Sequence, residues 1–247
     1  SINTSNSLYT VTDRAGYVYT YTIPSNSSRG YLSGITTPDG NALIIEYGST
    51  AVRPTQIKLK PNGQSAFVQL EIEYNTSGLV SRVFNPHTNE AYIFYYSTTY
   101  SSSSYSRNAS GFLRKMVYVK GTDSTTATEW SGYLPTTTTG TITKIAEATY
   151  SYDSSGRLIT ARDELSAQEI RYTYDSNSRI STVAEYAGTG SSATQGQKIG
   201  FTYLYDATKV RSSGTDDAYG TTDDLYTNYV FDARGRTVNA YTTDYNG

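Results

Sequence analysis

Short runs in which aromatic or apolar residues alternate with polar ones recur along this chain, and turn-forming residues separate them. In the segment 150–163, YSYDSSGRLITARD, the alternation places Tyr150 and Tyr152 on one face of a strand. The run DSSG that follows predicts a type I turn, because Asp153 suits its first position and Gly156 suits its fourth. The segment therefore predicts a β-hairpin.

The same phrase returns along the chain. Tyr174 follows Tyr152 by 174 − 152 = 22 residues, and YLYD (203–206) and YVFDARGRT (229–237) continue the series. Degenerate copies are expected at Ile72 to Val80, with Asn75 in the Asp place and Gly78 in the Gly place, at Leu32 to Gly48, with Pro38 to Asn41 as the reversal, and at Tyr9 to Thr22. Such a period indicates an array in which each unit buries its face against its neighbours.

The clearer copies share a set of signature residues, for which we expect a structural role. Asp153, Asp175, Asp206 and Asp232 are expected to cap the turns, because an active site is needed once and not four times. Ser178 and Lys209 replace Gly, and Phe231 replaces the second Tyr. The full set is Tyr150, Tyr152, Asp153, Gly156, Arg157, Leu158, Tyr172, Tyr174, Asp175, Arg179, Tyr203, Tyr205, Asp206, Tyr229, Asp232, Gly235 and Arg236.

The phrase Tyr-x-Tyr-Asp-x-x-Gly-Arg-Leu at Tyr150 to Leu158 resembles the YD repeat of the Rhs family, which includes bacterial rearrangement-hotspot proteins, wall-associated repeat proteins, toxin-complex shells and teneurins. The resemblance implies a long antiparallel sheet that spirals into a hollow shell, which in some members encloses a toxic C-terminal polypeptide. Family members with cargo also carry an Asp-Pro-x-Gly-Leu-type self-cleavage region. This sequence has no such motif, so these residues are expected to be inert.

The pattern predicts one all-β array over residues 1–247: antiparallel hairpins in a continuous curled or spiralling sheet, degenerate over 1–120 and clearer over 142–247. Polar, Ser/Thr-rich segments predict long loops at Tyr96 to Gly111 and at 121–141, and a third excursion at Ala187 to Lys198. The strand-like run Phe112 to Gly121 favours hairpin excursions over interdomain linkers. The chain also ends, at Asp244 to Gly247, in what resembles another repeat, so we expect a fragment of a larger protein.

Composition agrees with this fold. Only 36% of the residues are hydrophobic and 26 are Tyr, so burial depends on rings with one apolar face and one polar edge. The net charge of −2, without a basic run, argues against nucleic-acid binding. The absence of Cys excludes disulfides and thiolate chemistry, and no run approaches the roughly 20 apolar residues of a membrane helix.

No residue pattern predicts an enzyme or a cofactor. His87, the sole histidine, lies in NPHTNE, where an exposed turn is expected, and no serine has a G-x-S-x-G surrounding. The densest acidic group is Asp216, Asp217, Asp223 and Asp224; its spacing is not that of an EF-hand, so we expect a solvated acidic loop, with a calcium site as the alternative.

Two functions remain from the sequence. The first is a structural segment of a secreted or cell-surface bacterial protein, whose shell or stalk encloses or presents another segment, with a C-terminal cargo of the same chain as partner. The second is a cell-wall or host glycan-binding module, in which exposed tyrosines stack on sugar rings. Choline-binding aromatic cages are disfavoured, because they prefer Trp and Trp130 is the only one.

Overall fold

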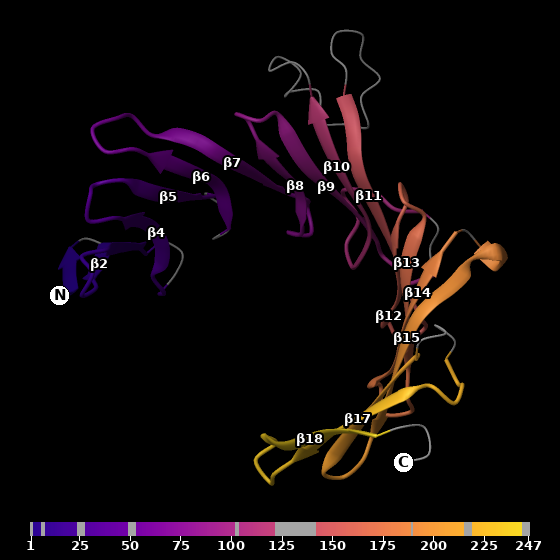
Figure 1. Cartoon of the computed structure of the whole chain (residues 1–247). Helices are drawn as coiled ribbons and strands as arrows, with labels where there is room; N and C mark the ends of the chain where they lie inside the picture. The colour runs from indigo at the N-terminus through magenta and orange to yellow at the C-terminus, as the bar shows by residue number, and fades with distance from the viewer. Residues whose placement is uncertain are drawn as a thin grey trace. The chain divides into compact units, whose positions relative to one another are not determined.

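The computed structural model describes residues 2–5, 8–23, 28–48, 53–101, 104–121, 142–188, 190–214 and 219–243 (Figure 1). These residues form strands and one short 3-10 helix, Gly190–Ser192. The strands are β1 Ile2–Ser5, β2 Leu8–Thr12, β3 Val18–Thr22, β4 Tyr31–Thr36, β5 Ala42–Tyr47, β6 Pro54–Lys60, β7 Phe67–Tyr74, β8 Val80–Asn85, β9 Glu90–Ser97, β10 Phe112–Gly121, β11 Ile142–Tyr152, β12 Leu158–Asp163, β13 Gln168–Tyr174, β14 Ile180–Ala187, β15 Thr194–Tyr203, β16 Ala207–Ser212, β17 Leu225–Phe231 and β18 Thr237–Thr243.

The all-β, antiparallel fold expected from the alternating pattern is confirmed. From β1 to β9 and again from β11 to β18, each strand pairs antiparallel with the strand that follows it in sequence. β10 belongs to the same sheet and pairs with β9. Every described connection between paired strands is thus a hairpin, as tight turns between successive strands require.

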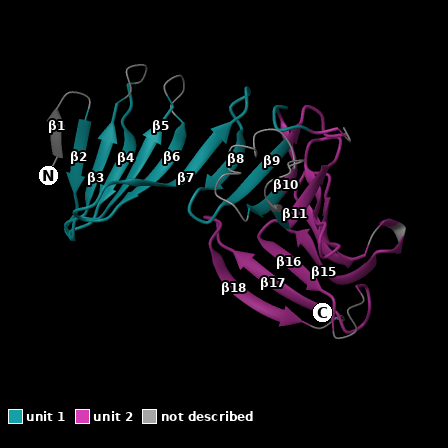
Figure 2. Cartoon of the chain, turned by 90° about the horizontal axis from the view of Figure 1, so that it is seen from above, with its two compact units in different colours: residues 1–95, 106–110, 117–145 teal, residues 96–105, 111–116, 146–247 magenta. Residues whose placement is uncertain are grey.

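The chain divides into two compact units (Figure 2). Unit 1 comprises residues 1–95, 106–110 and 117–145, and unit 2 comprises residues 96–105, 111–116 and 146–247. In unit 1, β2 to β7 lie side by side in sequence order, as Figure 2 shows. In unit 2, β12 to β18 follow one another in the same way.

Apolar burial is concentrated in one small cluster of unit 1. Phe84 of β8, Ala91 and Ile93 of β9, and Val117 and Val119 of β10 are all nearly fully buried and pack together. Most other strand residues of the described chain are half-buried, as expected for sheet faces that no helix layer covers. Stability must therefore depend strongly on strand pairing and on side-chain links between hairpins.

The expected loops have different outcomes. Residues 98–101 and 104–111 contain no strand longer than a single bridge residue, and Phe112–Gly121 is a strand, both as predicted. The expected excursion from Ala187 to Lys198 is mostly wrong, because β14 runs to Ala187 and β15 begins at Thr194. Their bulged ladder, with Tyr186 opposite Gln195, pairs the polar residues despite their loop-like composition.

Several expectations fall outside the described residues. These are the loop at 122–141 with Trp130, the acidic residues Asp216 and Asp217, and the ending at Asp244 to Gly247. No described helix has the length and apolar character needed to cross a membrane.

Candidate functional site

The repeat turn is a five-residue loop held by one carboxylate. Asp153 Oδ1 accepts hydrogen bonds from the backbone N–H groups of Ser155 and Arg157, both at 2.9 Å. Asp153 Oδ2 accepts from Arg157 Nε at 2.7 Å. The Gly156 N–H donates to the Asp153 carbonyl at 2.9 Å, and Gly156 has a φ of +77°, where a Cβ would be strained. Asp153 and Gly156 thus stand first and fourth in a turn that the Gly156 N–H closes.

The same turn occurs in both units. Asp175 and Asp232 repeat the contacts of Asp153, including the ion pairs to Arg179 at 2.8 Å and to Arg236 at 2.7 Å. In unit 1, Asp13 and Asn75 cap the equivalent turns through one side-chain oxygen. Each of these hairpins except the Asp13 one shifts register at the residue before the cap, so the loop is accommodated by a bulge.

Among the described residues, five tyrosine hydroxyls link the end of one strand to the strand before it. Between β12 and β13 the ladder runs only from Asp163–Gln168 to Thr160–Arg171, and beyond it the Tyr174 hydroxyl donates to the Leu158 carbonyl at 2.7 Å. Each such tyrosine ends its strand and reaches the first or second residue of the preceding strand. The pairs are Tyr47–Leu32, Tyr74–Pro54, Tyr152–Leu113, Tyr174–Leu158 and Tyr203–Ile180, at 2.7 to 2.9 Å.

The signature arginines strengthen the same link in unit 2. The guanidinium carbon of Arg157 lies 4.5 Å from the centre of the Tyr174 ring, and that of Arg179 lies 4.3 Å from the centre of the Tyr203 ring. Each arginine also pairs with the capping Asp of its own turn. Cap, arginine and the next tyrosine therefore form a chain of contacts from one repeat to the following one.

We expect Tyr174→Phe to reduce the free energy of unfolding of unit 2 by about 1 kcal/mol, because the Leu158 carbonyl loses its partner while the ring remains. Urea denaturation, followed by hydrogen exchange of the β12 and β13 amides, measures the loss. Tyr172→Phe is the matched control, since the Tyr172 hydroxyl forms no hydrogen bond within the described residues. Equal effects of the two substitutions would contradict the role of the hydroxyl link.

The capping carboxylates predict how stability depends on pH. The pKa values of Asp153, Asp175 and Asp232 lie below the ordinary 3.8, chiefly because backbone N–H groups of the turn donate to the ionised form, and the arginine of each turn adds to this. A depressed folded pKa means that the unfolded chain takes up the proton first. This contribution to stability is thus present above 3.8 and is lost as pH falls through the lower folded values.

Urea midpoints measured between pH 6 and pH 2.5 are therefore expected to be level near neutrality and to fall steeply below about pH 4. Asp175→Asn keeps an oxygen that accepts from the turn amides, as Asn75 does, but it has no carboxyl group that can take up a proton in acid. The urea midpoint of this variant should fall less steeply in acid than that of the natural chain. An identical acid profile for the variant and the natural chain would show that the Asp175 cap does not carry the effect.

The copy at YLYD differs from the sequence expectation. Tyr203 ends β15 and forms the hydroxyl link, whereas Tyr205 is fully exposed and Asp206 lies in a tighter turn closed by the Leu204 N–H and the Ala207 carbonyl. Lys209 is a residue of β16 and does not take the Gly position of a turn. The five-residue loop is replaced here by a shorter one.

The acidic segment behaves differently from a solvated loop at Asp224. This side chain is fully buried and pairs with the Arg211 guanidinium, and its Oδ2 also accepts the Gly220 N–H at 2.9 Å. The guanidinium carbon of Arg211 lies 4.6 Å from the centre of the Tyr219 ring and 5.3 Å from the centre of the Tyr226 ring. A Cβ on residue 200 would lie 1.9 Å from the Tyr219 hydroxyl, which explains the glycine in mid-strand.

Among the described residues, no three His, Cys, Asp or Glu side chains come together as a metal site. His87 is exposed in the turn between β8 and β9, as predicted, and its ring lies edge-on to Phe67 at 4.9 Å. The Asn85 side chain caps this turn by accepting the His87 N–H at 2.9 Å, so the segment has a local structural role.

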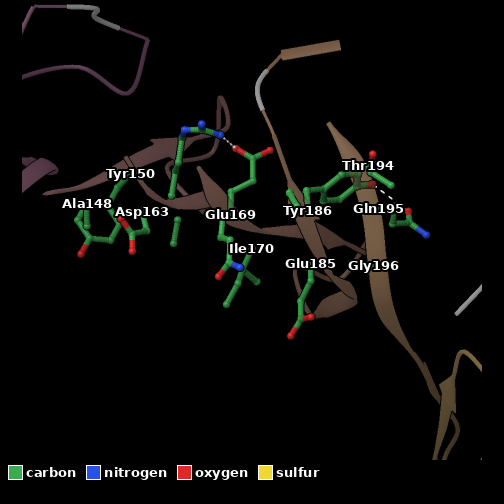
Figure 3. A pocket seen from close by; sticks show the side chains of 14 residues that line it. Ala148, Tyr150, Asp163, Glu169, Ile170, Glu185, Tyr186, Thr194, Gln195 and Gly196 are labelled. Carbon is green, nitrogen blue, oxygen red and sulfur yellow. Dashed lines mark hydrogen bonds and ion pairs between the residues drawn. The ribbon is translucent and has the colours of Figure 1, made fainter. Parts of the chain in front are cut away.

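One concave site lies within unit 2, on the strands β11 to β15 (Figure 3). We call it the Ala161 hollow; it has a volume of about 530 Å³. Its lining includes the small residues Ala148, Ala161, Ala187 and Gly196, together with Tyr150 and Ile170. Among the signature residues only Tyr150 lines it. The hollow was not predicted, because small residues on four strands become neighbours only through the register.

Comparisons with known proteins bear on the fold. No family model matches the chain, and no curated protein matches it. Among solved structures, a crystal structure of TcdB2-TccC3 is 18% identical with a TM-score of 0.56, and one of TcdB2-TccC3-TEV is 18% identical with a TM-score of 0.55. Each match covers 91% of this chain and 10% of the other chain.

A third similar structure is that of a Photorhabdus luminescens Tc holotoxin pore with a TccC3 mutation. It is 14% identical, has a TM-score of 0.56, and is matched over 98% of this chain and 12% of the other. At these identities the likeness shows the fold alone, and it agrees with the all-β sheet of antiparallel hairpins expected from the turn motif. This chain spans about a tenth of the length of the structures that it resembles.

Proposed function

We propose that this chain is a non-catalytic wall segment of a larger secreted or cell-surface bacterial protein, in which the repeats enclose or present another segment of the same polypeptide. The observation that carries the proposal is the link between repeats. In unit 2 a cap, an arginine and the next tyrosine occur together twice, so that the turns at Asp153 and Asp175 are each tied to the following repeat. Because each link joins only neighbouring repeats, such an arrangement can extend a sheet by further repeats and holds the repeats together.

The fold of the similar structures supports this proposal. Two of them contain the pair TcdB2-TccC3, and the third is part of a Tc holotoxin pore. Because this chain matches about a tenth of each, it corresponds in size to a section of such a sheet. The Rhs resemblance of Tyr150 to Leu158 adds the expectation of a C-terminal cargo.

Glycan binding is less well supported by the tyrosines. Stacking on a sugar needs a free ring face, yet Arg157 covers Tyr174 and Arg179 covers Tyr203. Their hydroxyls are already committed to backbone carbonyls. The rings of Tyr174 and Tyr203 are therefore used within the sheet.

Limited proteolysis of the full-length parent protein under native conditions, with mass spectrometry of the products, tests the proposal. A polypeptide outside the repeats that stays protected until the sheet is denatured is the expected result. A parent bearing Tyr152→Phe, Tyr174→Phe and Tyr203→Phe together should release that polypeptide at lower urea concentration. Digestion of everything outside the repeats while the repeats persist would overturn containment, and titration with soluble wall sugars, monitored by tyrosine fluorescence, would then test the glycan alternative.

A further inference from the structure

The two sides of the sheet at the Ala161 hollow carry different chemistry. The register places Ala148 opposite Asp163 and Ile170 opposite Glu185, so these side chains project from one side. Arg162, Glu169 and Tyr186 alternate with them along the strands, and Figure 3 shows Glu169 pointing away from Glu185. These three residues also contribute to the lining of the hollow. The apolar floor and its two carboxylates thus share one face.

On the opposite side, the charges compensate one another. Arg162 Nη1 lies 3.4 Å from Glu169 Oε2, its Nε lies 3.1 Å from Glu164 Oε2, and Nη1 also donates to the Gly188 carbonyl at 2.9 Å. Arg171 pairs with Glu169 and covers the Tyr186 ring, with its guanidinium carbon 3.7 Å from the ring centre. Arg162 thus lines the hollow with its charge already paired to Glu164 and Glu169.

On the side of the hollow, Glu185 has no such compensation. Its side chain is exposed, and within the part of the chain that the structure describes its carboxylate takes part in no hydrogen bond or ion pair. It borders the floor directly, because a Cβ built on Gly196 would lie 3.9 Å from Glu185 Oε2. Asp163 stands at the other margin, where it also caps its own turn through the Leu165 N–H at 2.8 Å.

We propose that the Ala161 hollow is a binding site for an extended polypeptide segment in which aliphatic side chains alternate with lysine or arginine. The shallow floor of alanines accepts an aliphatic side chain and removes it from water, while Glu185 and Asp163 attract a cation on the neighbouring position. An extended peptide can lie along the strip of the sheet that holds the apolar floor and the two carboxylates. Because the apolar and the charged contact lie next to each other on this strip, aliphatic and basic side chains must alternate along the peptide.

A sugar fits this site less well. Of the two aromatic residues that line the hollow, Tyr186 is covered by Arg171 and donates its hydroxyl to Gln195 Oε1 at 2.9 Å. Tyr150 is half-buried, so it offers a limited stacking surface. The inference does not depend on the wall function, because an empty or open sheet would carry the same hollow.

The test uses the 247-residue chain and the probe peptide acetyl-Lys-Leu-Lys-Leu-Lys-amide, with acetyl-Glu-Leu-Glu-Leu-Glu-amide as the charge-reversed probe. Titration is followed by NMR of the amides of Ala161, Ala187 and Gly196. We expect the basic peptide to shift these amides and to bind more weakly as salt is raised. The acidic peptide should leave them unchanged.

Two substitutions separate the contributions. Glu185→Gln should weaken binding about threefold, as the loss of one exposed ion pair implies. Ala187 is exposed, and Ala187→Leu should fill the floor with a larger side chain. Binding should then weaken at least tenfold, because the burial of about one aliphatic side chain of the peptide is lost. Asp206→Asn is the matched control, an exposed acid of the same unit whose charge loss should leave binding unchanged.

Retained NMR dispersion in every variant establishes that the fold is intact. The proposal is overturned if the basic peptide produces no shift at millimolar concentration, if both peptides bind equally, or if Glu185→Gln and Ala187→Leu bind like the natural chain. Shifts of the same three amides by chitotriose, without any by the basic peptide, would assign the hollow to a glycan instead. None of these outcomes bears on protection of cargo in the parent protein, so the two proposals fail separately.

Discussion

An Asn75→Asp variant is expected to be less stable than the natural chain by about 2 kcal/mol, although Asp is the residue that the repeat motif has at this position. Asn75 is buried, and its Oδ1 caps the turn by accepting from the N–H groups of Ser77 and Leu79. Its Nδ2 donates to the carbonyls of Arg107 and Ala109, at 3.0 and 2.8 Å. A carboxylate would keep the cap but would place an oxygen against two carbonyl oxygens.

Urea denaturation at pH 7, with hydrogen exchange of the amides in 104–111, measures this change. Asn239→Asp is the matched control, since Asn239 is exposed in β18 and the same substitution there should be close to neutral. The destabilisation by Asp at position 75 should also shrink in acid, where the carboxyl group is protonated and can donate. A variant as stable as the natural chain would mean that the amide of Asn75 contributes nothing to holding residues 107–109.

The turns were predictable because their chemistry is local. Asp153, Gly156 and Arg157 lie within five residues, and the contacts among them need no knowledge of the remaining chain. Ser178 shows how strongly the position is specified: it adopts a φ of +63° although it is not glycine. At Asp206 the expected five-residue loop is absent, so a matching Tyr and Asp alone did not specify it.

Contacts across longer stretches of sequence could not be predicted. The Nδ2 of Asn75 meets carbonyls 32 and 34 residues away, and the Tyr203 hydroxyl meets a carbonyl 23 residues away. These pairings follow from register, which a bulge before each cap shifts. The alternation correctly placed Tyr172 and Tyr174 on strands, but only the register shows that one hydroxyl is a link and the other is not.

The division of roles among the tyrosines explains how a chain with few aliphatic residues holds a single-layer sheet together. The ladders β12–β13 and β14–β15 stop before the strands end. There a tyrosine hydroxyl donates to a backbone carbonyl of the neighbouring strand, which a Phe or a Leu could not do. The proposed wall function therefore rests on the residue type that dominates the composition.

Arg211→Met is expected to cost about 3 kcal/mol, the largest effect of a single substitution in unit 2 that we predict. Asp224 is fully buried, its Oδ1 has no hydrogen-bond partner among the described residues, and its Oδ2 has Arg211 as its cation. Methionine preserves much of the packing between Tyr219 and Tyr226 but leaves the buried carboxylate uncompensated. The urea midpoint and the exchange rates of the β16 and β17 amides measure the effect.

Lys209→Met is the matched control for this experiment. Lys209 lies two residues earlier on β16 and 4.4 Å from the centre of the Tyr226 ring, but it forms no ion pair within the described residues. Its loss should cost only about 0.5–1 kcal/mol, as for an exposed cation–π contact. The double variant Arg211→Met, Asp224→Asn should recover part of the loss, because the charge that lacked a partner is then absent. If Arg211→Met and Lys209→Met had equal effects, the buried ion pair would not be what anchors residues 219–224 to the sheet.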